Sequence, residues 1–329
     1  MDPHLTLAYK LAKLTPRPAE ARFHTSLTDR ELQRLFEPWG WLNVSKAGHA
    51  VNNVACVAIT DGRPVNIDAS LGGDQLDIDL LQEIAHHDFE IGGKNEWDGA
   101  PTRYSHFVLR LLSRTHCQNS FPLVRPRLQQ MRRTLGRSLE TLDIGCGPLS
   151  WLRWGALEGL LNVTGIDPLI EVYEIILARH GLLGLPAIMP SRRLPRTIES
   201  VHGAGEHLDH YDFIFTNNAL DHVQDIQKAI DGICWALAPH GIAYLQVATR
   251  EGTRQNWGQL HQHDLYLEDG FLKAAKQDGS VMKICGPSCP LRVGEVLQYR
   301  PDGLTVVVSK PLVAEPRHAF PALVPQRDE

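Results

Sequence analysis

A strand, a glycine-rich turn and a helix follow one another between residues 139 and 158, and this succession restricts the fold more than any other part of the chain. An apolar run is followed by Asp143 and one further residue. Gly145 and Gly147 come next, with one residue between them. Glycine lets a chain turn sharply and present its amide groups without a Cβ in the way. Residues 151–158 then have the pattern of a helix. Because this arrangement brings backbone close to nucleotide-like ligands, we expect a cofactor site at the turn.

Beyond residue 121, stretches typical of buried strands alternate with stretches of helical pattern. The expected strands are residues 139–144, 161–166, 211–216 and 242–247, and the expected helices are residues 124–135, 170–180 and 225–237. This alternation argues for a parallel sheet covered by helices on both faces. Two further strand-like runs, 294–299 and 304–309, are joined by turn-prone residues, which predicts an antiparallel hairpin at the sheet edge. We therefore expect an α/β fold, with a doubly wound, mostly parallel sheet and a terminal antiparallel hairpin.

Residues 1–120 have a different character, and we expect them to form an N-terminal α+β extension to a main domain of residues 121–329. Thr28 and Glu31 have the spacing of a capping box at a helix start. The other elements expected in this region are a hairpin within residues 51–69 and helices at 77–86 and 105–115. The sequence of the extension indicates no known fold, so it is expected to hold what is specific to this protein.

The composition argues against several classes of protein. The formal net charge of the 329 residues is −5, so no overall positive field attracts nucleic acid. The arginines between residues 125 and 137 fit a solvated helix face better than RNA contact. Six cysteines without a paired motif indicate reduced thiols, and no histidine or cysteine spacing indicates a metal. The sequence shows neither a signal-peptide pattern nor a membrane-spanning apolar run, so we expect a cytoplasmic protein with no membrane partner.

The residues around the turn bear on the kind of cofactor. Asp167 follows Gly147 by twenty residues at the end of the next expected strand, where an acid can accept both hydroxyls of a ribose. A nicotinamide dinucleotide fits this pattern equally well. Ser150, however, stands where a dinucleotide fold has its third glycine, and Asp143 precedes the first glycine, where it can hold an ammonium group. These details, together with two asparagines that end the strand 211–216 and the terminal hairpin, favour a different cofactor.

From about residue 121 to 310 the chain resembles the class I S-adenosylmethionine-dependent methyltransferases of the small-molecule type. Five segments carry the resemblance, in the order that this family has them: a glycine-rich motif at 142–147, a ribose-binding acid at 165–167, an adenine-side segment at 203–208, a post-strand segment at 213–223, and an L-x-P-G-G turn at 235–241. His240 replaces a glycine of the last motif. The resemblance implies S-adenosyl-L-methionine as the cofactor.

The resemblance also assigns cofactor-binding residues. In that family, Asp143 and the glycine turn would face the methionine part, Asp167 would hold the ribose, and Gly205 with the residue after it would lie on the adenine side. The full set that it implies is Asp143, Gly145, Cys146, Gly147, Asp167, Gly205, Glu206, Asn217 and Asn218.

Two histidines are candidate general bases, since histidine exchanges protons near neutral pH. His222 follows the strand 211–216, near the expected position of the cofactor's sulfur, and its alternative role is packing or capping. His261 lies in the segment 260–264, which resembles an L-H-Q-W segment of some relatives that act on sugars or glycan-like substrates. Asp264 would orient His261. The alternative interpretation of this segment is a polar surface loop.

The expected reaction is methyl transfer to an oxygen or nitrogen of a polar small or medium-sized acceptor, such as a sugar, a peptide or a secondary metabolite. Residues 1–120 would recognise this acceptor or form a homodimer. Two other classes stay open. A NAD-dependent oxidoreductase is disfavoured by Ser150 and the terminal hairpin, and a non-catalytic binding module of the same fold is disfavoured by the intact glycine turn and acid.

Overall fold

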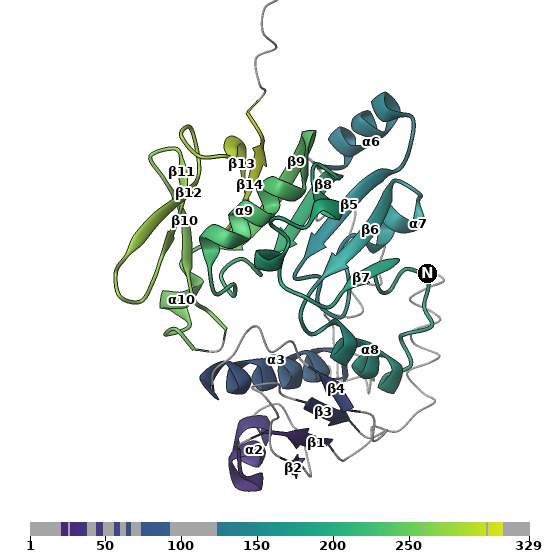
Figure 1. The fold of residues 1–329 in the computed structure, drawn as a ribbon, viewed down its shortest axis with the longest axis vertical. Coiled ribbons are helices and arrows are strands. Elements are labelled where there is room, and N and C mark those ends of the chain that lie inside the picture. Colours follow the sequence, from purple (N-terminus) through teal and green to yellow (C-terminus); the bar gives the residue numbers. More distant parts are fainter. Residues whose placement is uncertain are drawn as a thin grey trace, which may run out of the picture.

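A seven-stranded mixed sheet lies at the centre of the chain from residue 124 onward (Figure 1). The computed structural model describes residues 21–25, 27–37, 44–48, 56–59, 64–66, 74–92, 124–258, 260–300 and 302–311. The helix expected at 105–115 lies outside these residues. The strands of the central sheet are β5 (Leu139–Ile144), β6 (Leu161–Ile166), β7 (Arg192–Leu194), β8 (Tyr211–Asn217), β9 (Leu237–Ala248), β13 (Arg292–Arg300) and β14 (Gly303–Ser309).

The order of these strands is β13-β14-β9-β8-β5-β6-β7. Strands β5 to β9 are parallel, β14 is antiparallel to β9, and β13 is antiparallel to β14. The expected doubly wound sheet with a terminal antiparallel hairpin is therefore confirmed. Because β5 pairs with β6 on one side and with β8 on the other, the strand order reverses at β5. Ligands of open α/β sheets bind at such a reversal, beyond the carboxyl ends of the strands.

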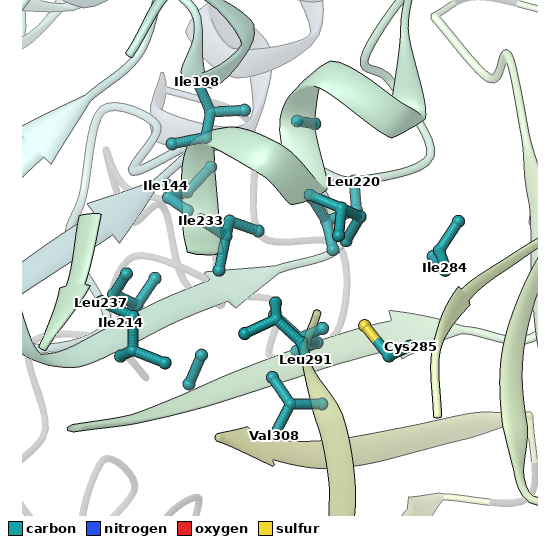
Figure 2. Packing of buried hydrophobic residues seen from close by; sticks show 14 of the residues in the cluster. Ile144, Ile198, Ile214, Leu220, Ile233, Leu237, Ile284, Cys285, Leu291 and Val308 are labelled. Atoms are coloured by element: carbon teal, nitrogen blue, oxygen red, sulfur yellow. The ribbon is translucent and has the colours of Figure 1, made fainter. Parts of the chain in front are cut away.

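Different helices cover the two faces of the sheet. Helix α9 (Ile226–Ala236) packs on the face that carries Ile144 and Ile214, and Figure 2 shows Ile233 of this helix beside them. Helix α6 (Val124–Leu135) packs on the other face, which carries Phe213. Neighbouring residues of β8 thus face opposite sides, as the two-residue period of a strand requires.

A second sheet lies between β9 and β13 in the sequence and was not predicted. Its strands are β10 (Asp264–Glu268), β11 (Phe271–Ala275) and β12 (Val281–Cys285), in that order. Ile284 and Cys285 of β12 join the buried cluster beneath α9 (Figure 2). The exposed positions of β12 include Val281 and Met282, so this strand lacks the alternation by which a half-buried strand is recognised from sequence.

The described part of residues 1–120 contains a small four-stranded sheet and two helices. The elements are β1 (Ala21–His24), α2 (Asp29–Phe36), β2 (Val44–Gly48), β3 (Cys56–Ile59), β4 (Pro64–Asn66) and α3 (Asp74–Gly92). The capping box of Thr28 and Glu31 and the hairpin of β3 and β4 are both confirmed. Helix α3 is longer than the expected 77–86.

Helix α3 is attached to helix α8 (Ile170–Arg179) by apolar packing and by one buried acid. Leu81 and Ile84 belong to the same hydrophobic cluster as residues of α8. Asp88 of α3 lies 2.7 Å from Nε2 of His180 and 3.4 Å from a guanidinium nitrogen of Arg179. The N-terminal region therefore packs on the helix that follows β6, as Figure 1 shows. A domain boundary near residue 120 stays a prediction.

One local expectation is confirmed in a shorter form, and another is wrong. The helix expected at 151–158 after the glycine turn is α7, which spans only Arg153–Leu157 and ends before Gly159, whose φ is 63°. It is too short to direct a substantial dipole at a ligand. Residues 239–241 do not form a turn after α9 but lie within β9, where the register shifts between Tyr211 and Phe213 of the neighbouring strand. Among the described residues, no helix combines the length and the apolar character that crossing a membrane requires.

Candidate cofactor and acceptor site

The glycine turn follows β5 and lies against the loop that follows β8. Gly145 and Gly147 have φ values of 60° and 58°, in the left-handed region that favours glycine. A Cβ on Gly145 would overlap the Cβ of Ala219, so the loop after β5 touches the loop after β8. Within the part of the chain that the structure describes, no atom lies within 4 Å of the position that a Cβ on Gly147 would take. The turn is thus closed at its first glycine and open at its second.

Asp167 follows β6 and reaches the same turn. Its Oδ2 accepts a hydrogen bond from the amide of Gly147 at 3.2 Å, and its Oδ1 accepts one from the amide of Leu169 at 2.8 Å. The residue is only 7% exposed, and this burial raises the pKa of its carboxyl to about 6, although both amides oppose the shift. An acid beside the open glycine is in the position expected for a ribose-binding group.

Asp143 is slightly more buried than Asp167. It is 2% exposed, and Ser150 Oγ donates a hydrogen bond of 2.6 Å to its Oδ2. The amide of Leu152 in turn donates to Ser150 Oγ at 3.2 Å. Burial raises the pKa of Asp143 to about 7; the Ser150 bond opposes this shift, and the charge of Asp167 adds to it. Ser150 therefore fixes the carboxylate of the turn, a role that its place in the glycine motif did not reveal.

Cys146 faces away from the open side of the turn. Its side chain is buried, and a Cβ on Gly165 would come within 2.9 Å of its sulfur. The absence of a Cβ at Gly165 thus makes room for this thiol, whose pKa is raised by burial. The thiol of Cys146 is therefore packed against β6.

Asn218 holds the ends of two strands together. Its φ is 53°, its amide donates to the carbonyl of Gln246 at 2.9 Å, and its Oδ1 accepts from the amide of Ala248 at 3.0 Å. Asn217 is the last residue of β8 and pairs with Gln246. The side chain of Asn218 is therefore engaged in positioning the loop that follows rather than directed at a ligand.

Gly205 and Glu206 lie at the amino ends of the strands, opposite the glycine turn. They belong to the short 3-10 helix η4 (Gly205–His207), which precedes the amino end of β8. The carbonyl of Ala204 accepts a hydrogen bond of 3.1 Å from the indole of Trp235, near the carboxyl end of α9. The structure does not bring this pair to the glycine turn. The segment that begins after β7 lies there instead, since the amide of Asp167 donates to the carbonyl of Leu194 at 3.2 Å. The short, exposed β7 gave no sequence signal.

Asp221 joins the two candidate bases. His261 Nδ1 lies 2.6 Å from Asp221 Oδ2, and His222 Nε2 lies 3.4 Å from the same oxygen. The loop that carries His261 is fixed to Asp221, whose backbone carbonyl accepts from the amides of Gln262 at 2.7 Å and His263 at 3.1 Å. Asp221 comes two residues after Ala219, so this cluster and the glycine turn share one edge of the sheet.

The expected partner of His261 is wrong. Asp264 accepts hydrogen bonds from the amide and hydroxyl of Thr253 and does not orient the imidazole. His261 is 7% exposed, so the polar surface loop is wrong as well. Burial favours neutral His261, but the bond and charge of Asp221 raise its pKa overall. Burial likewise opposes charge on Asp221, yet the nearby charge of His222 and the bond to His261 hold its pKa below the ordinary value.

Helix α3 supplies a second charged group near the cofactor acid. His87 Nε2 lies 2.9 Å from Glu83, its Nδ1 lies 3.3 Å from Glu90, and its ring meets the ring of Tyr173 edge-on at 5.1 Å. Burial opposes charge on His87, but the two glutamates raise its pKa to about 10. The charges of His87 and Glu83 both act on Asp167, so this face of α3 is turned toward the site. Spacings of three and four residues on a helix were the signal available in the sequence.

Comparison with known proteins identifies the class. The profile of a methyltransferase domain family matches residues 104–273, which is more than half of the chain. The chain belongs to this family, and it is a class I methyltransferase with S-adenosylmethionine as its cofactor. No curated protein matches the sequence significantly.

Several solved structures are similar to this chain at low identity. The 1,6-didemethyltoxoflavin N1-methyltransferase of Burkholderia thailandensis is 16% identical over 62% of this chain and 85% of its own, with a TM-score of 0.35. The N-methyltransferase NodS of Bradyrhizobium japonicum is 18% identical over 58% and 97%, with a TM-score of 0.35. A methyltransferase of Clostridium acetobutylicum is 12% identical over 56% and 89%, with a TM-score of 0.34.

Proposed function

We propose that this methyltransferase transfers a methyl group to an oxygen or nitrogen of a small polar acceptor that binds beside Asp221. The observation that carries the proposal is the contact of Gly145 with Ala219, which sets the glycine turn next to the Asp221 cluster. When bound, S-adenosylmethionine supplies a methyl group already activated on sulfur, so the protein's task is to bind and align the reactants.

The cofactor-binding residues are assigned by their position around the open glycine. The carboxylate of Asp167 accepts hydrogen bonds from ribose hydroxyls, and the amide edge at Gly147 lies against the cofactor. Asp143 supplies negative charge beneath the turn for the ammonium group of the methionine part. These assignments are supported by the burial of both acids and by the free space at Gly147.

His261 is the favoured general base. Its Nδ1 is held by Asp221, and among the described residues no hydrogen bond engages its Nε2. A carboxylate that fixes one imidazole nitrogen leaves the other to take a proton and then stabilises the imidazolium that forms. His222 is the second candidate, since it shares the same carboxylate at a longer distance and is partly exposed. The acceptor proton would pass to Nε2 of His261 as the acceptor atom attacks the methyl group.

Residues 1–120 are proposed to recognise the acceptor. Helix α3 turns Glu83 and His87 toward Asp167, so a side chain from this region contributes to the walls around the site. This placement supports acceptor recognition over a role confined to oligomerisation, because a residue used only for assembly would lie on an outer surface.

Release of S-adenosylhomocysteine from S-adenosylmethionine, measured with a panel of sugars, phenols and amines, tests the proposal. With an accepted substrate, His261→Gln should lower kcat by about 10²- to 10⁴-fold, the usual contribution of a general base. Its affinity for S-adenosylhomocysteine should stay within about twofold, because His261 lies on the acceptor side. The matched control is His240→Gln, since His240 also contacts an aspartate, Asp212, at 2.7 Å but lies at the opposite edge. Equal activity of His261→Gln and the wild type would overturn the assignment of the base.

A further inference from the structure

The three side chains that meet at Asp221 also form a donor set for a metal ion. One ligand atom from each of Asp221, His222 and His261 lies within 4.8 Å of the others. Asp221 and His261 are buried, and the imidazole rings of His222 and His261 meet at 4.8 Å between centroids. Two imidazoles and one carboxylate from two separate loops thus converge on one point.

Among the described residues, no hydrogen bond reaches Nε2 of His222, which lies 3.4 Å from Asp221 Oδ2, and none reaches Oε2 of Glu251, although both atoms are buried. The charge of Glu251 acts on His261, and that of Glu83 acts on both histidines, so these carboxylates surround the cluster. Buried polar atoms are nearly always paired, so an unpaired one that faces other donors indicates a place where a ligand binds. Several carboxylates gathered at a buried point favour the binding of a positive charge there.

The kind of cation follows from the donors. Imidazole nitrogen and carboxylate oxygen together suit borderline transition cations such as Zn²⁺ or Co²⁺, whereas Mg²⁺ and Ca²⁺ prefer oxygen alone. Tetrahedral Zn²⁺ with bonds of about 2.0–2.1 Å separates its donors by about 3.3 Å. The 3.4 Å between Asp221 Oδ2 and His222 Nε2 already has this length. His261 Nδ1 lies 2.6 Å from the same oxygen, so this nitrogen must move slightly farther from the oxygen to reach the separation of two zinc donors.

We propose that Asp221, His222 and His261 bind one divalent transition cation such as Zn²⁺. We propose further that the bound cation prevents proton transfer, because it takes the carboxylate and the imidazole nitrogen on which the action of His261 as a base depends. The binding half of this proposal stands on the donor geometry alone. The inhibitory half rests on the proposed function, because it requires that His261 be the base. The fourth position of the cation would be left to water or to the acceptor, since three protein donors leave a tetrahedral site open.

Calorimetric titration of the full chain with ZnCl₂, after removal of metal by chelation, tests the binding half. The wild type should bind one Zn²⁺ per chain, and His222→Gln and His261→Gln should each weaken binding at least tenfold. His240→Gln should bind as the wild type does, because the His240–Asp212 pair contains a single histidine. MgCl₂ should produce no binding heat, and CoCl₂ should give the visible absorption of a low-coordinate cobalt site.

Absence of Zn²⁺ binding, or equal binding by His222→Gln and the wild type, would overturn the proposal. Melting temperatures show whether each variant is folded, and the use of two variants guards against the loss of one. Titration with S-adenosylhomocysteine separates the two proposals. Zn²⁺ binding without S-adenosylhomocysteine binding would contradict the proposed function and leave the metal site standing. S-adenosylhomocysteine binding without Zn²⁺ binding would do the reverse. In the wild type, Zn²⁺ should abolish methyl transfer while changing the affinity for S-adenosylhomocysteine less than twofold.

Discussion

Alanine at Gly145 should destabilise the fold more than alanine at other glycines of the same backbone conformation. A left-handed conformation costs a non-glycine residue about 1–2 kcal/mol, and the stiffer unfolded chain returns about 0.4–1 kcal/mol of this. At Gly136, whose φ is 68°, no atom of the described residues lies within 4 Å of a Cβ, so only this difference applies. At Gly145 the new methyl would also overlap Ala219, at a separation below the 3.0 Å that real Cβ atoms keep. Overpacking of this kind adds about 1–3 kcal/mol.

Urea unfolding of the wild type, Gly145→Ala and Gly136→Ala measures this difference. We expect Gly145→Ala to lose about 2–4 kcal/mol and Gly136→Ala about 1 kcal/mol or less, with similar dependence on urea. Gly147→Ala has the same strain without an overlap. Its stability should match that of Gly136→Ala, but its affinity for S-adenosylhomocysteine should fall at least tenfold, because the methyl enters the space assigned to the cofactor. Equal stabilities of Gly145→Ala and Gly136→Ala would refute the close contact between the two loops.

Three further predictions concern single acids. Asp143 and Asp167 have folded pKa values of about 7 and about 6, above their ordinary 3.8, so their contribution to stability is fully present below pH 4 and is lost as pH rises toward 7. The free energy of unfolding of Asp143→Asn should therefore fall less than that of the wild type between pH 4 and 8; an equal fall would contradict the burial of this acid. Asp221→Asn should lower kcat at least tenfold with unchanged affinity for S-adenosylhomocysteine, whereas Asp225→Asn, at the helix N-cap, should leave kcat unaltered. Asp88→Ala removes the carboxylate beside buried His180 and should cost about 3–5 kcal/mol in urea unfolding, against about 1 kcal/mol or less for Asp209→Ala, whose partner Lys310 lies near the surface. Similar costs for these two variants would show that α3 is not held by Asp88.

The sequence was sufficient for the central sheet because its signals are local. Strand β5 occupies the predicted residues 139–144, since apolar runs and the glycines that follow depend on near neighbours alone. Strand β7 escaped prediction because two of its three residues are arginines. The second sheet escaped because, in β12, apolar Val281 and Met282 are exposed, so hydrophobicity and burial do not alternate together. The partner of His261 could not be predicted either. Asp264 is closer in sequence, but Asp221 is brought to it by pairing between loops forty residues apart.

The adenine-side segment shows the same limit. Gly205 and Glu206 occur in the right order along the chain, but order does not determine which edge of a sheet a loop occupies. The segment before β8 lies at the amino ends of the strands, because β8 begins at Tyr211 and runs toward the glycine turn. In contrast, Asp167 was correctly placed at the glycine turn, because the carboxyl ends of adjacent parallel strands necessarily share an edge.

Calorimetric titration with S-adenosylhomocysteine tests the central claim most directly, because it needs no knowledge of the acceptor. The wild type should bind one molecule per chain, NAD should give no binding heat, and Asp167→Ala should weaken S-adenosylhomocysteine binding at least tenfold through the loss of charge-assisted hydrogen bonds. Binding of NAD instead, or an affinity for S-adenosylhomocysteine that is the same in the wild type and Asp167→Ala, would contradict the placement of the cofactor between the glycine turn and this acid.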